Sequence, residues 1–267
     1  MLSEVIFASL FVYGIGAISA LTLTLASKYM KIADDEAFEN IRNILPGINC
    51  GACGFSGCDG YAAALAKGSA EPNLCTPGGE RVKSELSKLL GNGSQEEVKR
   101  LRAFVACIGG EANAVCNADY QGYPSCKAAS LCGGGALQCK YGCLGFGDCA
   151  KVCPTNAIKI EGALAVVDES LCIGCRKCVN ACPKGIIAMA GYGENVRIRC
   201  SSKDTGALTR NGCKRGCIAC GKCEKICPTS AIKIVDNLSV IDYKKCISCT
   251  ECVKTCPVKC IEDAGCI

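Results

Sequence analysis

The sequence contains no histidine and no tryptophan among its 267 residues, and its aromatic residues are few, six Phe and eight Tyr. The lack of histidine excludes Cys₂His₂ zinc fingers, Rieske centres and His-ligated haem. It also excludes the Cys–His and Ser–His nucleophiles of hydrolytic enzymes. With so few aromatic side chains a large conventional core is not expected, so the fold needs another source of free energy.

Nucleotide-binding motifs are absent as well. The sequence has no P-loop, and no G-x-G-x-x-G follows an expected strand. The run Gly133-Gly134-Gly135 lies between cysteines and is typical of a bend. We therefore expect no nucleotide or flavin on this chain, and any hydride transfer would take place on another subunit.

Cysteine, in contrast, is abundant, with 28 residues. That level is typical of disulfide scaffolds in short secreted chains, but this chain is longer and its cysteines follow metal-ligand spacings. Bound metal can supply the missing folding free energy. The formal net charge of +5 counts cysteine as neutral. Twenty thiolates around five [4Fe–4S]²⁺ cores would change it to about −5, so nucleic acid is not an expected partner.

The N-terminal segment is apolar. Residues 5–27 carry no charge, and Glu4 and Lys28 flank them. As a helix the run would be about 35 Å long, enough to cross a bilayer. A cleaved signal peptide is the alternative, but Glu4 stands where such a peptide has basic residues. Since Lys28 and Lys31 follow the run, we expect a single-pass anchor in the cell (inner) membrane, with the C-terminal bulk on the cytoplasmic side.

Breaks and repeats divide the rest of the chain. A charged helix is expected over 32–45, and a capping box at Ser94 and Glu97 predicts another helix after a Gly-rich break. The segment 154–160 (PTNAIKI) recurs at 228–234 (PTSAIKI), which predicts a duplicated α+β unit. The expected parts are a transmembrane anchor (1–30), a Cys-rich [4Fe–4S] domain (31–90), a linker helix with a Cys-containing connector (91–135), and two dicluster-ferredoxin-like modules (136–195 and 196–267).

Three stretches share the spacing C-x₂-C-x₂-C-x₃-C-P, and a fourth is a loosened version. The strict copies begin at Cys172, Cys217 and Cys246, and the variant contains Cys139, Cys143, Cys149 and Cys153. In bacterial ferredoxins of this spacing the fourth cysteine ligates the other cluster of the pair. Applied here, the rule predicts four sites: Cys139, Cys143, Cys149 with Cys182; Cys172, Cys175, Cys178 with Cys153; Cys217, Cys220, Cys223 with Cys256; and Cys246, Cys249, Cys252 with Cys227.

A different spacing occurs near the N-terminus, where Cys50, Cys53, Cys58 and Cys75 form one compact group. Neighbouring glycines would let the backbone approach a cluster closely. Four thiolates from one segment can also hold zinc, which stays open as an alternative here. For the C-x₂-C triplets zinc is disfavoured, because zinc sites use two separated pairs.

Eight further cysteines belong to none of these motifs. Five clusters are expected from the motifs, and burial as small apolar side chains is the ordinary interpretation of the remaining cysteines. A sixth cluster from four of them, Cys107, Cys126, Cys200 and Cys213, stays open as the alternative, since two precede the first module and two lie between the modules. The other four are expected to be unligated: Cys116, Cys132, Cys260 and Cys266.

Basic residues are frequent around the modules. They fit either an ordinary solvated surface or a face that steers an acidic electron carrier. The residues concerned are Arg176, Lys177, Lys184, Arg197, Arg199, Lys214, Arg215, Lys222 and Lys225.

Residues 47–55, GINCGACGF, together with an apolar N-terminus and the tandem ferredoxin motifs, resemble the B subunits of Rnf complexes. These complexes are membrane-bound ferredoxin:NAD⁺ oxidoreductases that couple electron flow to Na⁺ or H⁺ transport. The resemblance implies an electron-transfer subunit that accepts electrons from soluble ferredoxin and relays them through five or six [4Fe–4S] clusters. The implied partners are membrane subunits and subunits that bear NAD and flavin. Two alternatives stay open: a subunit of a different membrane reductase, and a zinc-stabilised interaction protein.

Overall fold

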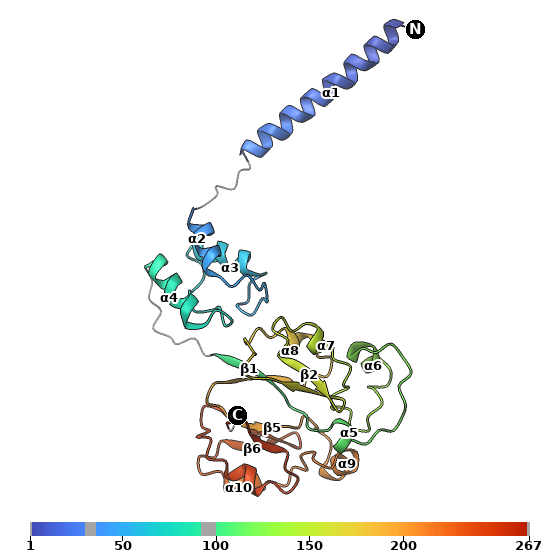
Figure 1. Cartoon of the computed structure of the whole chain (residues 1–267), viewed down its shortest axis with the longest axis vertical. Helices are drawn as coiled ribbons and strands as arrows, with labels where there is room; N and C mark the ends of the chain where they lie inside the picture. Colours follow the sequence, from blue (N-terminus) through green and yellow to red (C-terminus); the bar gives the residue numbers. More distant parts are fainter. Residues whose placement is uncertain (1, 30–35, 92–99, 266–267) are drawn as a thin grey trace.

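The computed structural model describes residues 2–29, 36–91 and 100–265, and it contains both helices and strands. Figure 1 shows a long helix, a small helical domain and a C-terminal body that carries the strands. The long helix is α1 (Leu2–Tyr29). The mixed helix-and-sheet class expected from the sequence is therefore present, although the strands form four separate two-stranded sheets rather than one layer.

The expected membrane span is not supported. Within the part of the chain that the structure describes, no helix is both long enough and apolar enough to cross a membrane. The predicted localisation, a single pass through the inner membrane, is contradicted by this finding. Glycine, serine and threonine residues interrupt the leucines of α1 and lower its apolar content. Two of its hydroxyls, those of Thr22 and Thr24, donate to carbonyls of the preceding turn.

The helical domain consists of α2 (Glu36–Ile44), α3 (Cys58–Ala66) and α4 (Gly79–Leu90). Its core is built from one apolar face of each helix, represented by Ile41, Leu65 and Leu86, all 1% exposed or less. The first residues of the helix expected over 32–45 lie outside the described residues, and α2 is its described part. The loops between these helices carry Cys50, Cys53 and Cys75, and Cys58 is the first residue of α3.

The C-terminal body contains two units of the same design. The first unit comprises β1 (Leu101–Val105), α5 (Gly110–Asn113), α6 (Cys126–Leu131), α7 (Asp148–Lys151), β2 (Ile158–Glu161), β3 (Leu164–Val167), α8 (Lys177–Ala181) and β4 (Ile187–Gly191). The second unit comprises β5 (Val196–Ile198), α9 (Gly206–Gly212), α10 (Lys222–Ile226), β6 (Ile232–Val235), β7 (Leu238–Ile241), α11 (Glu251–Thr255) and β8 (Ile261–Asp263). In each unit the first strand pairs antiparallel with the last, and the two middle strands form a hairpin.

The end of the segment that was expected to be a linker helix forms a strand. Ser94 and Glu97 lie outside the described residues, and residues 101–105 form strand β1. Each of these five residues pairs with β4, from Leu101 opposite Gly191 to Val105 opposite Ile187. Pairing and burial of Ala103 and Val105 override the local helical signal, because β4 offers an open edge. The connector is therefore part of the first unit.

The turn after each Cys-Pro pair is the same in all four copies. The third residue after the cysteine has a positive φ in every case: Asn156 at 52°, Gly185 at 61°, Ser230 at 50° and Lys259 at 51°. Positive φ is uncommon for residues other than glycine, so its recurrence marks one shared backbone shape. This turn leads the chain directly into β2, β4, β6 and β8 and holds the preceding cysteine at the start of a strand.

Candidate metal centres

The four N-terminal cysteines lie together in the helical domain. Burial and, to a smaller extent, the neighbouring Cys58, Cys53 and Cys50 together raise the pKa of the Cys75 thiol to about 11. Asn49 positions this loop, since its side-chain oxygen accepts a hydrogen bond from the Cys58 backbone N–H at 2.8 Å. We call this group, Cys50, Cys53, Cys58 and Cys75, the N-terminal cage.

A second group is cage A, formed by Cys153, Cys172, Cys175 and Cys178. These four side chains line one cavity between β2, β4 and α8. Burial and, to a smaller extent, the nearby Cys172, Cys175 and Cys153 together raise the pKa of Cys178 to about 11. Two backbone N–H groups donate to its sulfurs, Ala157 to Cys153 at 3.3 Å and Ala103 to Cys172 at 3.4 Å. The structure thus brings together the set that the fourth-cysteine rule groups.

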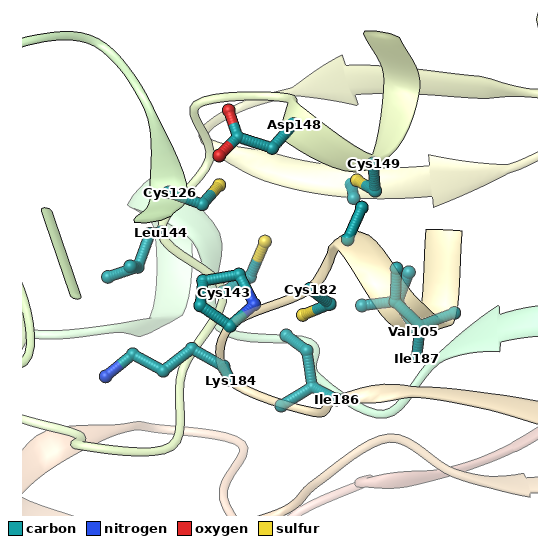
Figure 2. A pocket seen from close by; sticks show the side chains of 13 residues that line it. Val105, Cys126, Cys143, Leu144, Asp148, Cys149, Cys182, Lys184, Ile186 and Ile187 are labelled. Carbon is teal, nitrogen blue, oxygen red and sulfur yellow. The ribbon is translucent and has the colours of Figure 1, made fainter. Parts of the chain in front are cut away.

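Cage B consists of Cys126, Cys143, Cys149 and Cys182, which line a single cavity. Figure 2 shows their sulfur atoms directed into the same space from separate segments of the chain. The sequence-based grouping has Cys139 in place of Cys126. In the structure Cys139 does not line this cavity and faces a different one.

The repeat register explains the place of Cys126. Cys143 precedes Cys149 by six residues, the separation of Cys217 from Cys223. The fourth motif therefore keeps the strict spacing and has Phe146 where the others have their second cysteine. Backbone geometry agrees, since Gly147 has the positive φ found at Gly221, at 77° and 71°. Helix α6 supplies the missing thiol from Cys126 at its first turn.

Asp148 ties α6 to the rest of cage B. Its carboxylate accepts hydrogen bonds from the Ser125 hydroxyl at 2.8 Å and the Lys127 backbone N–H at 3.0 Å, on either side of Cys126. Burial acts to raise the pKa of Asp148, but these hydrogen bonds and Lys151 outweigh it and hold the pKa below its usual value. The next residue along α7 is Cys149. The Asp148 carboxylate therefore ties the segment that carries Cys126 to the helix that carries Cys149.

We expect Asp148→Ala to loosen cage B selectively. Two hydrogen bonds to a mostly buried carboxylate are lost, which costs about 2–3 kcal/mol of the free energy holding α6 in place. On anaerobic incubation with an iron chelator, the variant should release about four irons per chain ahead of the rest. Asp168→Ala is the matched control, because Asp168 makes similar bonds to Ser170 in an exposed turn. Equal iron release from both variants would contradict the assignment.

A further cavity lies between the two units. Its four thiols are Cys107, Cys139, Cys200 and Cys213, which we call the central cage. Cys107 follows β1 and Cys200 follows β5, while Cys139 and Cys213 each stand four residues before the first ligand of their unit. Each unit therefore contributes two equivalent cysteines, and the cage lies where the repeats meet.

Hydrogen bonds to the central sulfurs follow the same symmetry. Cys107 accepts from the backbone N–H of Cys143 at 3.4 Å, and Cys200 accepts from that of Cys217 at 3.3 Å. Each also accepts from the N–H two residues later in the chain, at 3.4 and 3.5 Å. Donors aimed at sulfur in this way suit thiolate ligands. They also place the central cage next to a ligand of each neighbouring cage.

In the second unit the structure places Cys223 near Cys217 and Cys220, and Cys252 near Cys246 and Cys249. The fourth-cysteine rule completes these two groups. It gives cage C, Cys217, Cys220, Cys223 and Cys256, and cage D, Cys227, Cys246, Cys249 and Cys252. Burial raises the pKa of Cys252 to about 11, with contributions from Cys246 and Cys249. Cys227 repeats the surroundings of Cys153, with a backbone N–H donor, from Ala231, at 3.3 Å.

Cage C has two side-chain donors beside its sulfurs. The Ser239 hydroxyl lies 3.1 Å from the Cys223 sulfur and 3.6 Å from that of Cys217. Cys260 lies 3.7 Å from the Cys256 sulfur. The Cys260 thiol is the largest cause that lowers the pKa of Cys217 and of Cys256, although its single proton serves one sulfur at a time, and backbone N–H donors lower both pKa values further against the effect of burial.

The cages suit a cluster better than a single ion. Zinc–thiolate bonds of about 2.3 Å require sulfurs that converge closely on one point. Among the described residues no group of three or more His, Cys, Asp or Glu side chains could hold a single metal ion. Cages A, B and central instead each place four thiols around one cavity. Four cysteine thiolates are the ligand set of a [4Fe–4S] cluster, and the N–H donors to the sulfurs of cage A and the central cage suit its charge.

The cysteines expected to be unligated differ in their surroundings. Cys116 and Cys132 are exposed, whereas Cys260 is 1% exposed beside cage C. Cys266 lies outside the described residues. Burial of a thiol against ligand sulfurs, as at Cys260, is not visible in any spacing rule.

Several of the basic residues considered for docking have internal partners instead. Arg197 is 3% exposed and pairs with Glu169, and Arg199 pairs with Glu262. The Lys184 ammonium donates to the carbonyls of Gly134 and Lys140. These cations therefore hold loops and units together. Lys222 and Lys225, on α10, are exposed.

Comparison with protein families places iron–sulfur domains on the same segments. An Fe-S cluster family matches residues 45–77, a 4Fe-4S dicluster domain matches 216–260, and two 4Fe-4S binding domains match 164–187 and 143–157. The chain thus contains several 4Fe–4S binding domains, as the sequence predicts.

Similar proteins span most of the chain. The B subunit of a Na(+)-translocating ferredoxin:NAD(+) oxidoreductase complex from Acetobacterium woodii is 38% identical, covering 86% of this chain and 69% of the relative. The B subunit of the proton-translocating complex from Clostridium ljungdahlii is 41% identical, covering 85% and 81%. The B subunit of an ion-translocating oxidoreductase complex from Methanosarcina acetivorans is 38% identical, covering 87% and 88%.

Proposed function

The chain belongs to the family of B subunits of ion-translocating ferredoxin:NAD(+) oxidoreductase complexes, and we propose that it carries electrons from reduced ferredoxin to the other subunits of such a complex. Hydride chemistry then belongs to those subunits, and this chain transfers electrons only. The observation that carries the proposal is the row of cysteine cages that runs through three parts of the chain.

Six clusters are proposed, each held by four cysteines. The ligands are Cys50, Cys53, Cys58 and Cys75 (N-terminal cage); Cys153, Cys172, Cys175 and Cys178 (A); Cys126, Cys143, Cys149 and Cys182 (B); Cys107, Cys139, Cys200 and Cys213 (central); Cys217, Cys220, Cys223 and Cys256 (C); and Cys227, Cys246, Cys249 and Cys252 (D). When bound, these clusters supply one-electron transfer.

Contacts between the cages support a continuous route. The thiol of Cys175 in cage A lies close enough to Cys50 for the charge of Cys50 to raise its pKa, after the larger effect of burial. Lys177 fixes this junction by donating to the Ile48 carbonyl at 3.4 Å. The central cage accepts N–H hydrogen bonds from Cys143 of cage B and Cys217 of cage C. Direct contacts therefore join the central cage to cages B and C, and Lys177 joins the loop of the N-terminal cage to cage A.

Exposure favours the second unit as the entry for electrons. Cys220 of cage C and Cys249 of cage D are exposed, and Ile247 beside Cys249 is 65% exposed. Lys222 and Lys225 lie on the adjoining helix. An external carrier can approach a cluster closely here, and a negatively charged ferredoxin would be attracted by the lysines.

Anaerobically purified protein should contain about 24 irons and 24 sulfides per chain, and reduced ferredoxin should reduce its clusters. Rapid mixing at rising salt should slow that reduction, since screening weakens charge attraction. Replacing both Lys222 and Lys225 by Glu should slow it further at low salt, and replacing the distant Lys67 and Lys88 by Glu should not. Zinc in place of iron, or clusters that ferredoxin fails to reduce, would overturn the proposal.

A further inference from the structure

Cages B and C occupy the same place in their units, yet two side chains beside them differ. Ala165 on β3 pairs with Ile160, and Ser239 on β7 pairs with Ile234 at the same register of the matching hairpin. Both positions are buried, at 1% and 4% exposure. Each is the second residue of its strand, and the two strands have the same pattern of buried and exposed residues. The two positions are therefore equivalent.

The second pair follows the fourth cysteine of each cage. Ile186 stands four residues after Cys182, and Cys260 stands four residues after Cys256, immediately before strands β4 and β8. Ile186 is 3% exposed and Cys260 is 1% exposed. In the first unit, Ala165 and Ile186 both line the cage B cavity and carry no hydrogen-bond donor on their side chains.

In the second unit these two positions are donors in contact with ligand sulfurs. The Ser239 hydroxyl reaches Cys223 at 3.1 Å and Cys217 at 3.6 Å. The Cys260 sulfur lies 3.7 Å from that of Cys256. Buried hydroxyls are nearly always hydrogen-bonded, and the atoms nearest to the Ser239 hydroxyl here are cage sulfurs. Two side-chain donors thus lie beside three of the four cage C sulfurs.

We propose that Ser239 and Cys260 raise the reduction potential of the cage C cluster above that of its cage B counterpart. This inference rests on the proposed function. Reduction adds negative charge to a cluster and its sulfurs, and a donor held against sulfur stabilises the more negative state. In a buried site the effect is larger than in water. The side chains of Ala165 and Ile186 donate no hydrogen bond to the sulfurs of cage B.

The consequence is a direction within the relay. With clusters bound, Ser239 and Cys260 would favour an electron on cage C, next to the central cage, over one on cage B. Transfer from cage C to cage B would then run toward lower potential and would require a donor that keeps the second unit reduced. Ser239 and Cys260 tune a cluster without ligating it.

A reciprocal exchange tests the proposal on the full chain with its clusters. Ser239→Ala and Cys260→Ile give cage C the side chains of cage B, and Ala165→Ser and Ile186→Cys do the reverse. Redox titration followed by EPR measures each midpoint potential. Removing either donor from cage C should lower the equilibrium constant for reduction of one cluster about tenfold, which lowers its midpoint potential by about 59 mV for one electron. The reverse pair should raise one other midpoint.

The outcomes separate this inference from the proposed function. Unchanged midpoints in variants that keep all their iron would overturn the tuning role and leave the relay standing. Loss of about four irons in a Cys260→Ile variant whose stability is unchanged would also overturn it, because Cys260 would then be a ligand. Wild-type protein without [4Fe–4S] signals would instead overturn the proposed function. Ser239→Ala removes a single oxygen, so it tests the role even if Cys260→Ile perturbs the fold.

Discussion

Replacing Cys107 and Cys139 together by alanine should remove about four irons per chain, no more than either replacement alone. Both thiols line the central cage, opposite Cys200 and Cys213. A cluster lost through its first missing ligand cannot be lost again through a second. The two changes should therefore be strongly non-additive, as expected for residues that act on one site.

The matched double variant replaces Cys107 and Cys126. These residues line different cavities, so their effects should add and remove about eight irons. The grouping expected from the sequence predicts the reverse, because it places Cys107 with Cys126 and puts Cys139 in the first module. Iron and sulfide analysis of the single and double variants distinguishes the two. A loss of eight irons with Cys139 and four with Cys126 would restore the sequence-based grouping.

This contrast shows what local spacing contains and what it does not. Each strict motif indicates three ligands of one cluster within seven residues, and its Cys-Pro cysteine is predicted to be the fourth ligand of the partner cluster. The second ligand of cage B is different, since Cys126 is on α6 and lies 17 residues before Cys143. A connection of that length can take many conformations, so the sequence separation does not predict that the two side chains meet. A signal was nevertheless present: Cys143 and Cys149 keep the six-residue separation of Cys217 and Cys223, which leaves Cys139 outside the motif.

The fold was predictable to a similar extent. The repeated PTNAIKI and PTSAIKI segments correctly indicate the hairpins β2–β3 and β6–β7, because their apolar alternation matches strands with one buried face. Strand β1 was missed, since Leu101–Val105 becomes a strand only through its pairing with β4, some 85 residues later. The helix α1 was expected as a membrane span, an expectation that the described residues contradict. Contacts between distant segments decide both the strand β1 and the ligand Cys126.

The largest effect on stability is expected at Glu169. Its carboxylate lies 3.0 Å from Arg102 on β1 and 3.6 Å from Arg197 on β5, so it joins the two units. The Arg197 side chain is only 3% exposed, and its guanidinium lies over the Phe104 ring, 4.9 Å from the centroid. Replacing Glu169 by Gln would leave a buried cation without its counter-charge. Removal of one partner from such a buried pair costs about 3–5 kcal/mol.

Anaerobic guanidinium unfolding, followed by the visible absorption of the clusters, should therefore show a markedly lower midpoint for Glu169→Gln, with the slope unchanged. Glu262→Gln is the matched control, because Glu262 also pairs with two arginines, Arg199 at 2.9 Å and Arg215 at 3.1 Å. Its side chain is 34% exposed, and solvent can take over the role of the lost charge. The control should therefore lose about 1 kcal/mol or less. Equal losses in the free energy of unfolding for the two variants would mean that the burial of Arg197 does not determine the stability of the contact between the two units.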